Sequence, residues 1–244
     1  MDNLPKVYIG NIQILADREL FKKAYATVSL YRQQKIDSVK CDDDKLRSLG
    51  AGLLLQKALC DFGIDEKTAD FETDGNGKPF IRGAENLHFN LSHSGDRAMC
   101  VISDFSVGCD VEKIRKIDLR LAERFFHPDE IAQINAQSDE QQKTDLFFKI
   151  WTMKESVIKA TGLGLKMELS SFSVFNYVDS DNDNEAPAST ITSNSILPYK
   201  IFPLDFNDGY KYAVCMLASP EKVIFPEKEA KFANVVYIED FHYI

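Results

Sequence analysis

The sequence predicts an α+β protein made of two similar halves that meet near residue 105. Each half has a long helical pattern, at 43–60 and at 141–161, followed by a pair of strands that form a hairpin. The hairpin segments SGDRAMCVIS and DGYKYAVCMLAS both place a turn before a charged residue and an apolar run with Ala and Cys. We therefore divide the chain into halves 1–105 and 106–244, the second carrying the acidic motif, and expect a ligand in the cleft between them.

The remaining elements follow in order. In the first half we expect a strand in KVYIGNI, a helical pattern at 16–35, a short strand in GNGKPFI, and strands in LHFNLSHS and RAMCVIS. The second half begins with the strand SVGCDVE, and helices at 117–126, 128–137 and 141–161 come next. A strand in SSFSVFNYV and a hairpin of YKIFPLDF and YKYAVCMLAS complete it. The polar segment 179–195 reads as a mobile loop without chemistry, and the tail 220–244 is left without a role.

Composition narrows the class of protein. The 244 residues are 44% hydrophobic, enough for one large core or two small ones. A net charge of −9 argues against nonspecific binding to nucleic acid. The five cysteines contain no CxxC pair and three lie in apolar runs, which favours buried thiols over zinc or disulfides. We find no signal peptide or membrane span, and expect a cytoplasmic monomer.

A lysine stands on the apolar side of the helix KIWTMKESVIKATGLG, residues 149–164. At about 100° per residue, Lys154 falls within the apolar arc, Glu155 lies at its edge, and Lys159 follows Glu155 by one turn. One interpretation is that the stem of Lys154 reaches back to water and that Glu155 and Lys159 form a surface pair. The other is a charged cluster held rigidly at the mouth of a cleft.

Two carboxylates alternate on the strand VGCDVEK. Asp110 and Glu112 point to one face of it, and Cys109 and Val111 to the other. Like charges at this spacing repel unless a cation lies between them, although a solvated strand face is a common alternative. Hard oxygen ligands favour Mg²⁺ over Zn²⁺, and Glu155 is the third candidate ligand.

Further polar residues are ambiguous when taken singly. Ser92 and His93 in FNLSHSG suit either a phosphate contact or a structural role, and the absence of GxSxG argues against a nucleophilic serine. Lys78 is presented by a GKP turn, and Arg47 opens an amphipathic helix whose surface could explain it. Glu130 lies in the first turn of a helix, where the helix dipole alone could account for it.

In combination these motifs carry a resemblance. The segments VGCDVEK, RFFHPDE and WTMKESVIKATGLGL, preceded by GKPFI and FNLSHSG, resemble the Sfp-type 4′-phosphopantetheinyl transferases. That family's signature is G-x-D-x-E on a strand, followed about forty residues later by W-x-x-K-E-x-x-x-K, and the match runs from about residue 5 to 220. It implies two α+β halves related by pseudo-twofold symmetry, with coenzyme A bound in the cleft between them.

The resemblance also implies roles for the site residues. Asp110, Glu112 and Glu155 match the Mg²⁺ ligands, and Glu130 matches the acid that accepts the proton of the attacking serine. Lys154 and Lys159 match lysines on the coenzyme A phosphates. The catalytic residues that the resemblance implies are Glu130, Glu155 and Lys159. The other implied coenzyme A contacts are Arg32, Lys35, Arg47, Lys78, Ser92 and His93.

The implied reaction transfers 4′-phosphopantetheine from coenzyme A to a serine of an apo acyl or peptidyl carrier protein, and releases adenosine 3′,5′-bisphosphate. Such carriers serve fatty-acid, polyketide or nonribosomal peptide synthesis. An acidic carrier would be attracted to a basic strip near the metal site, which is otherwise a solvated face. This basic strip consists of Lys113, Arg115, Lys116, Arg120 and Arg124.

Two other functions remain open at this point. The chain could be a Mg²⁺-dependent hydrolase of coenzyme A or a related nucleotide, which turnover without a carrier would reveal. It could also be a non-catalytic module that binds a carrier or nucleotide, although the four acids Asp110, Glu112, Glu130 and Glu155 argue against this.

Overall fold

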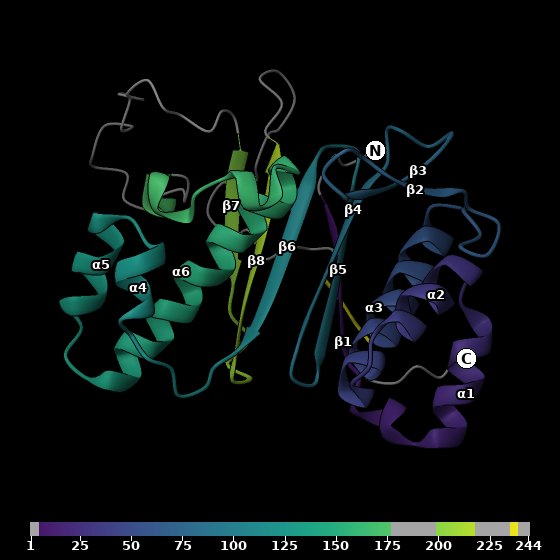
Figure 1. The fold of residues 1–244 in the computed structure, drawn as a ribbon, viewed down its shortest axis with the longest axis horizontal. Helices are drawn as coiled ribbons and strands as arrows, with labels where there is room; N and C mark the ends of the chain where they lie inside the picture. Colours follow the sequence, from purple (N-terminus) through teal and green to yellow (C-terminus); the bar gives the residue numbers. More distant parts are fainter. Residues whose placement is uncertain (1–4, 177–198, 218–234, 239–244) are drawn as a thin grey trace.

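Two β-sheets stand next to each other at the centre of the molecule, and helices cover the outer side of each (Figure 1). This is a computed structural model, and it describes residues 5–176, 199–217 and 235–238. The α+β class predicted from the sequence is confirmed. In the described part of the chain, none of the helices combines the length and apolar character needed to cross a membrane.

The first sheet has the strand order β4-β5-β1-β9. Its strands are β1 (Lys6–Asn11), β4 (His88–Ser94), β5 (Arg97–Ser103) and β9 (Val235–Ile238). β5 runs antiparallel to both β1 and β4, as the predicted hairpin requires, whereas β9 pairs with β1 in parallel. β9, which follows the predicted division at residue 105 in the sequence, thus belongs to the first sheet.

Three helices cover this sheet: α3 (Asp42–Asp61) packs against its strands, and α1 (Arg18–Thr27) and α2 (Leu30–Ser38) pack against α3. They follow a short 3₁₀ turn, η1 (Gln13–Ala16), and precede a small hairpin of β2 (Phe71–Thr73) and β3 (Pro79–Ile81). The single helical pattern at 16–35 is in fact two helices, because Val28 is extended and the Ser29 side chain caps α2 by accepting from the Arg32 amide. α3 carries most of the helical apolar residues of this core, among them Leu53, Leu54 and Leu55.

The second sheet has the order β6-β8-β7. Its strands are β6 (Val107–Lys113), β7 (Tyr199–Leu204) and β8 (Tyr210–Leu217), and its helices are α4 (Leu121–Phe125), α5 (Pro128–Asn135) and α6 (Glu140–Thr161). The predicted hairpin of β7 and β8 is confirmed, with Gly209 at φ +82 in its turn. Phe147 and Trp151 of α6 stack on each other, and Phe126 packs against Phe147. The helix ends at Gly162, which has the left-handed conformation.

Two predictions for the second half need correction. Residues 114–120 are not helical, so that the helix expected at 117–126 is reduced to α4. The strand expected at 170–178 is wrong: described residues there form 3₁₀ turns, η3 (Leu169–Ser171) and η4 (Val174–Asn176), after η2 (Gly164–Lys166). The reason is that Leu169, Phe172 and Val174 bond through their backbones to buried side chains of Lys154 and Glu130 instead of to a strand. The polar segment 179–195 lies outside the described residues, as does the tail 220–244 apart from β9.

The two sheets meet along their edge strands β4 and β6, which run side by side (Figure 1). Here side chains of β4 take the place of a backbone ladder, since alternate β4 side chains accept hydrogen bonds from alternate β6 amides. The constant register shows that the two strands run parallel. We call this row of contacts the seam. Its rungs are Cys109 N to Asn90 Oδ1 (2.9 Å), Val111 N to Ser92 Oγ (3.2 Å) and Lys113 N to Ser94 Oγ (3.1 Å).

β6 pairs with β8 at its other edge, and it also packs directly against α6. A Cβ atom at Gly108 would lie 2.3 Å from both the Ala160 nitrogen and the Ser156 carbonyl oxygen of α6. Only glycine fits this approach, because both neighbours are backbone atoms that cannot turn aside. The glycine of the G-x-D-x-E motif therefore sets the distance between the strand that carries Asp110 and the helix that carries Glu155.

We expect Gly108→Ala to lower the free energy of unfolding by about 1–3 kcal/mol, because the added methyl must push β6 from α6. Urea denaturation measures this quantity. The matched control is Gly75→Ala, since no atom lies within 4 Å of a Cβ built at Gly75. Equal stabilities of the two variants would contradict the close packing of strand and helix.

Candidate active site

Asp110 on β6 is the centre of the polar network between the two sheets. Its side chain is 7% exposed, and its Oδ1 atom accepts from Ser92 Oγ at 2.8 Å and from Lys159 Nζ at 2.6 Å. Its Oδ2 atom is buried and has no hydrogen-bond partner among the described residues. Burial raises the pKa of Asp110, against the opposing effect of the Lys159 ammonium. A buried carboxylate oxygen without a donor is a position where a cation would be stabilised.

Lys159 reaches this network from α6. Its Nζ atom lies 3.1 Å from Ser92 Oγ in addition to its pair with Asp110. Desolvation acts to lower the pKa of Lys159, but the Asp110 carboxylate outweighs it and the net direction is upward. Lys159 therefore stays charged, and it joins the lysine motif of α6 to the acidic motif of β6 by an ion pair that the sequence analysis did not predict.

Glu112 and Glu155 complete the group of acids. Glu112 Oε2 accepts from Ser94 Oγ at 2.8 Å and from Arg115 NH1 at 3.2 Å. Glu155 on α6 is half-buried, and burial, followed by the charges of Asp110 and Glu112, raises the pKa of its carboxyl group. Cys109 and Val111 point into an apolar cluster on the opposite face of β6, as the alternation predicts. Within the described ranges, no three Asp, Glu, His or Cys side chains converge closely enough to hold a metal ion as they stand.

Arg47 and His93 lie next to this network, Arg47 as a cation and His93 as an imidazole whose neutral form is favoured. His93 follows Ser92 on β4 and is exposed, and Arg47 on α3 pairs with Asp44 at 2.6 Å. Desolvation lowers the pKa of His93, and the nearby cations Lys159 and Arg47 lower it further. These groups therefore belong to one electrostatic neighbourhood, although they come from three different elements.

Lys78 is already bound by the protein. From the turn between β2 and β3, its Nζ atom lies 3.1 Å from the Val107 carbonyl, 3.0 Å from the Ala160 carbonyl and 3.4 Å from Ser106 Oγ. Desolvation lowers its pKa to about 8. Its ammonium thus joins the first half of the chain to the ends of β6 and α6, where the negative end of the helix dipole favours a cation.

Arg32 and Lys35, the two predicted site residues on α2, differ in their exposure to solvent. Arg32 is 8% exposed, its stem packs on Gly52, and its Nε atom is buried without a hydrogen-bond partner among the described residues. Desolvation lowers the pKa of its guanidinium. Lys35 is exposed, and its ammonium lies 5.5 Å from the centre of the Tyr31 ring.

Glu130 and Lys154 form a separate pair that solvent does not reach. Both side chains are completely buried, and Lys154 Nζ lies 2.8 Å from Glu130 Oε2. Lys154 also donates to the carbonyls of Leu169 and Phe172, at 2.7 and 2.6 Å. The Glu130 carboxylate accepts from the amides of His127 and Val174, both at 2.8 Å.

This arrangement explains why a lysine stands on the apolar face of α6: its partner is a buried carboxylate, and its stem does not reach back to water. It does not support the two roles predicted from the motif. A proton acceptor and a phosphate contact each need an atom that a ligand can reach, and every charged atom of this pair is enclosed and bonded to protein.

A pocket of about 510 Å³ opens beside Glu155. Its wall combines charged and apolar residues from α4, α6 and the turns after α6. The lining residues are Arg124, Phe125, Glu155, Ile158, Gly164, Met167, Glu168, Leu169 and Ser170. The pocket therefore places one member of the basic strip, Arg124, on the same cavity as one of the three candidate metal ligands.

Sequence reasoning did not single out Asn90 and Ser94. Both lie on β4 and contact β6, and Ser94 contacts Glu112 directly. A signal was present in FNLSHS, because Asn90, Ser92 and Ser94 alternate with Phe89 and Leu91. Such alternation indicates a polar strand face, but it does not say that the face meets another edge strand.

Comparison with known proteins finds matches to 4′-phosphopantetheinyl transferases along most of the chain. Residues 106–215 match the family model described as 4′-phosphopantetheinyl transferase superfamily, and residues 16–104 match 4′-phosphopantetheinyl transferase, N-terminal. The 4′-phosphopantetheinyl transferase Sfp of Bacillus subtilis is 34% identical over 82% of this chain and 85% of its own length. The 4′-phosphopantetheinyl transferase gsp of Aneurinibacillus migulanus is also 34% identical, over 83% of this chain and 82% of its own.

We expect Lys154→Met to lower the free energy of unfolding by about 3–5 kcal/mol, because it leaves the Glu130 carboxylate buried without a counter-ion. Glu130→Gln should also destabilise the protein, since it leaves the ammonium unpaired. The double variant should recover part of the loss because neither charge remains. Urea denaturation of the three variants measures this coupling, and additive losses would contradict it.

Proposed function

This chain belongs to the Sfp-type 4′-phosphopantetheinyl transferases, and from this premise we propose that its transfer site is the acidic cluster between β6 and α6. As a member of the family it is a transferase that activates carrier proteins. The observation that carries the proposed location is the Asp110 network, in which one carboxylate holds Lys159 and Ser92 and keeps a buried oxygen without a partner. Two similar halves related by pseudo-twofold symmetry, with coenzyme A between them, remain part of the proposal.

In the proposed reaction, a serine hydroxyl of the apo carrier attacks the β-phosphorus of coenzyme A. The new bond joins the serine oxygen to that phosphorus, and the bond to the bridging pyrophosphate oxygen breaks. The phosphopantetheine arm stays on the serine, and adenosine 3′,5′-bisphosphate leaves. The proton of the serine hydroxyl passes to an acceptor. The chain's own residues bind and orient both partners, and positive groups near the pyrophosphate favour the developing negative charge.

The acids have the chemistry that Mg²⁺ requires. Asp110, Glu112 and Glu155 supply only hard oxygen atoms. The Oδ2 atom of Asp110 has no hydrogen-bond partner among the described residues, so a bound cation would satisfy it. Burial, and after it the charges of Asp110 and Glu112, raise the pKa of Glu155, and a cation between the acids would relieve that repulsion. Because the three side chains do not yet converge, we propose that they rotate together on binding. When bound, Mg²⁺ would neutralise charge on the pyrophosphate.

Groups that can donate hydrogen bonds to phosphate oxygens lie around the same place. Lys159, Arg47 and His93 are electrostatic neighbours, so we propose them as the main contacts for the phosphates of coenzyme A. The buried guanidinium of Arg32 has a nitrogen without a partner in the described part of the chain, which supports a ligand near it. Contacts from Lys35, Lys78 and Ser92 rest on the family resemblance.

Glu130 is a weaker candidate for the proton acceptor than the motif implies, because the buried pair encloses its carboxylate. We propose that Glu130 and Lys154 instead hold the turns after α6, which form one wall of the pocket beside Glu155. The variant carrying both Glu130→Gln and Lys154→Met separates the two roles. A necessary proton acceptor should cost about 10²–10⁴ in turnover even in a folded double variant, whereas a holding role should not.

We propose that the carrier docks at the rim of the pocket beside Glu155. All five residues of the basic strip are exposed, but three are paired locally: Lys113 with Asp96, Arg115 with Glu112, and Arg120 with Asp118. Among the described residues, Lys116 and Arg124 have no ion pair, so the attraction for an acidic carrier rests mainly on these two. A cytoplasmic location is also proposed, supported by five free cysteines of which three are buried.

The site is tested with Asp110→Asn, which keeps the shape of the side chain and removes its charge. Transfer from labelled coenzyme A to a panel of apo carriers should fall at least about 100-fold and no longer respond to added Mg²⁺ after chelation, because the partnerless oxygen has lost its charge. Asp104→Asn, an exposed acid outside the network, is the control and should behave as wild type. Normal Mg²⁺-dependent transfer by Asp110→Asn would exclude this site.

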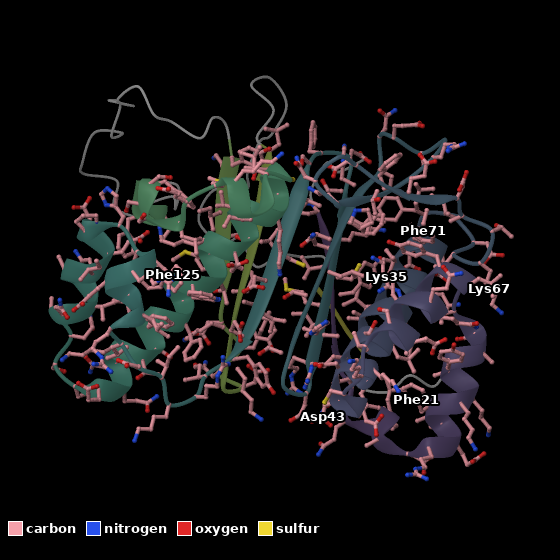
Figure 2. The ribbon with its side chains drawn as sticks, in the orientation of Figure 1. Phe21, Lys35, Asp43, Lys67, Phe71 and Phe125 are labelled. Carbon is pink, nitrogen blue, oxygen red and sulfur yellow. The ribbon has the colours of Figure 1, made fainter. Side chains whose placement is uncertain are left out.

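The docking proposal is tested with the pair Lys116→Glu and Arg124→Glu, which leaves Arg115 and its contact with Glu112 intact. The Michaelis constant for the carrier should rise about tenfold or more at low salt, and the constant for coenzyme A should not change. The matched control is Lys23→Glu with Lys67→Glu, two exposed lysines of the first half; Figure 2 shows Lys67 at the end of the molecule opposite Phe125. Equal constants for both pairs would contradict docking at this rim.

A further inference from the structure

The three rungs of the seam are chemically different. Asn90 accepts the Cys109 amide with its side-chain oxygen and contacts none of the acids. The rungs at Ser92 and Ser94 use hydroxyl groups, and each of these hydroxyls also donates to a carboxylate: Ser92 to Asp110, and Ser94 to Glu112. The two β4 side chains that also bond to a carboxylate are therefore hydroxyls, and the one that bonds only to β6 backbone is an amide.

A hydroxyl group can do both tasks at once because it has one donor and two acceptor positions. Ser94 Oγ accepts from the Lys113 amide at 3.1 Å, which orients the oxygen, and its proton is then directed to Glu112 Oε2 at 2.8 Å. A single atom, Ser94 Oγ, thus fixes both the backbone of β6 at Lys113 and the carboxylate of the preceding residue, Glu112. Ser94 is half-buried, so water can replace it only in part.

The second partner of Glu112 is Arg115, which lies at the exposed surface and not at the seam. Arg115 NH1 lies 3.2 Å from the same Oε2 atom, and its side chain is 59% exposed. Its guanidinium lies 5.4 Å from the centre of the Phe148 ring, on the basic strip. Without the Ser94 hydroxyl, Glu112 would keep only this exposed partner and would be free to follow it away from Asp110.

We propose that Ser94 is a positioning residue: its hydroxyl holds the Glu112 carboxylate next to Asp110 by tying it to the seam between the sheets. The inference rests on the proposed role of Glu112 as a ligand of Mg²⁺. Ser94 does not touch the reacting atoms in this scheme; it acts through Glu112 alone.

The first measurement is amide hydrogen exchange in the metal-free protein, and it does not depend on activity. Ser94→Ala should speed exchange of the Lys113 amide by about five- to tenfold, because that amide loses its acceptor. Asn90→Ala is the matched seam control and should speed exchange at Cys109 instead. Ser94→Thr keeps the hydroxyl on a strand position that favours β-branched residues and should restore protection at Lys113.

The second measurement is the Mg²⁺ dependence of transfer by the same variants. Ser94→Ala should raise the Mg²⁺ concentration for half-maximal rate by about 10–100-fold, the usual cost of losing an outer partner of a ligand, with the Michaelis constant for coenzyme A unchanged. Ser94→Thr should return it to the wild-type value, and Asn90→Ala should not alter it. If Ser94→Ala does not fold, Ser94→Cys, a weaker donor, replaces it in the comparison.

The outcomes are separable. Faster exchange at Lys113 with an unchanged Mg²⁺ requirement would overturn the proposal and leave Ser94 as a seam residue only. A Glu112→Gln variant with a wild-type Mg²⁺ requirement would remove the metal role of Glu112 itself, a failure of the proposed function that is seen without altering Ser94. In a Glu112→Gln background, Ser94→Ala should cause no further change in Mg²⁺ requirement, and an additional change would show that Ser94 acts by another route.

Discussion

The seam between β4 and β6 is the constraint on which the rest of the structure depends. Two edge strands meet there without a backbone ladder, and an unpaired buried amide would cost about 1–3 kcal/mol. Side chains of β4 meet that need at three successive rungs, and β6 is fixed on its remaining sides by β8 and by the close approach of Gly108 to α6. The strand that carries Asp110 and Glu112 is therefore held from three directions, which is the rigidity that a site for precise charge placement needs.

Charge balance inside the protein follows from the same arrangement. Asp110 faces Lys159, Glu112 faces Arg115, and Glu130 faces Lys154, so each of these motif acids has a cation from its own chain. Burying carboxylates next to one another is tolerable only with such partners. Glu155 differs, because in the described part of the chain no ion pair accompanies its half-buried carboxylate. The four acids of the motif thus divide into three that are neutralised locally and one that is held ready beside the pocket.

The sequence was informative wherever local pattern decides the outcome. Alternation placed Asp110 and Glu112 on one face of β6, helical periodicity located α3 and α6 within a residue or two, and the turn residues located both hairpins. It failed where distant side chains decide. Nothing in SSFSVFNYV indicates that Lys154 and Glu130 bind its backbone groups and replace a strand by 3₁₀ turns. Likewise, Glu130 looks like an accessible helix-cap acid until the fold encloses it with Lys154, and the two partners of Ser94 lie 18 and 19 positions away.

The pairing of β9 with β1 has a consequence for the order in which the protein can be assembled. β1 leaves the ribosome well before its parallel partner β9, because almost all the other helices and strands lie between them in the sequence. Until then one edge of β1 has no neighbour, although β5 can already cover the other. An open strand edge invites pairing with another nascent chain, and contacts this distant in sequence form slowly. The first sheet is therefore exposed to misassembly until β9 has been made, and a chain cut before β9 would keep that edge open permanently.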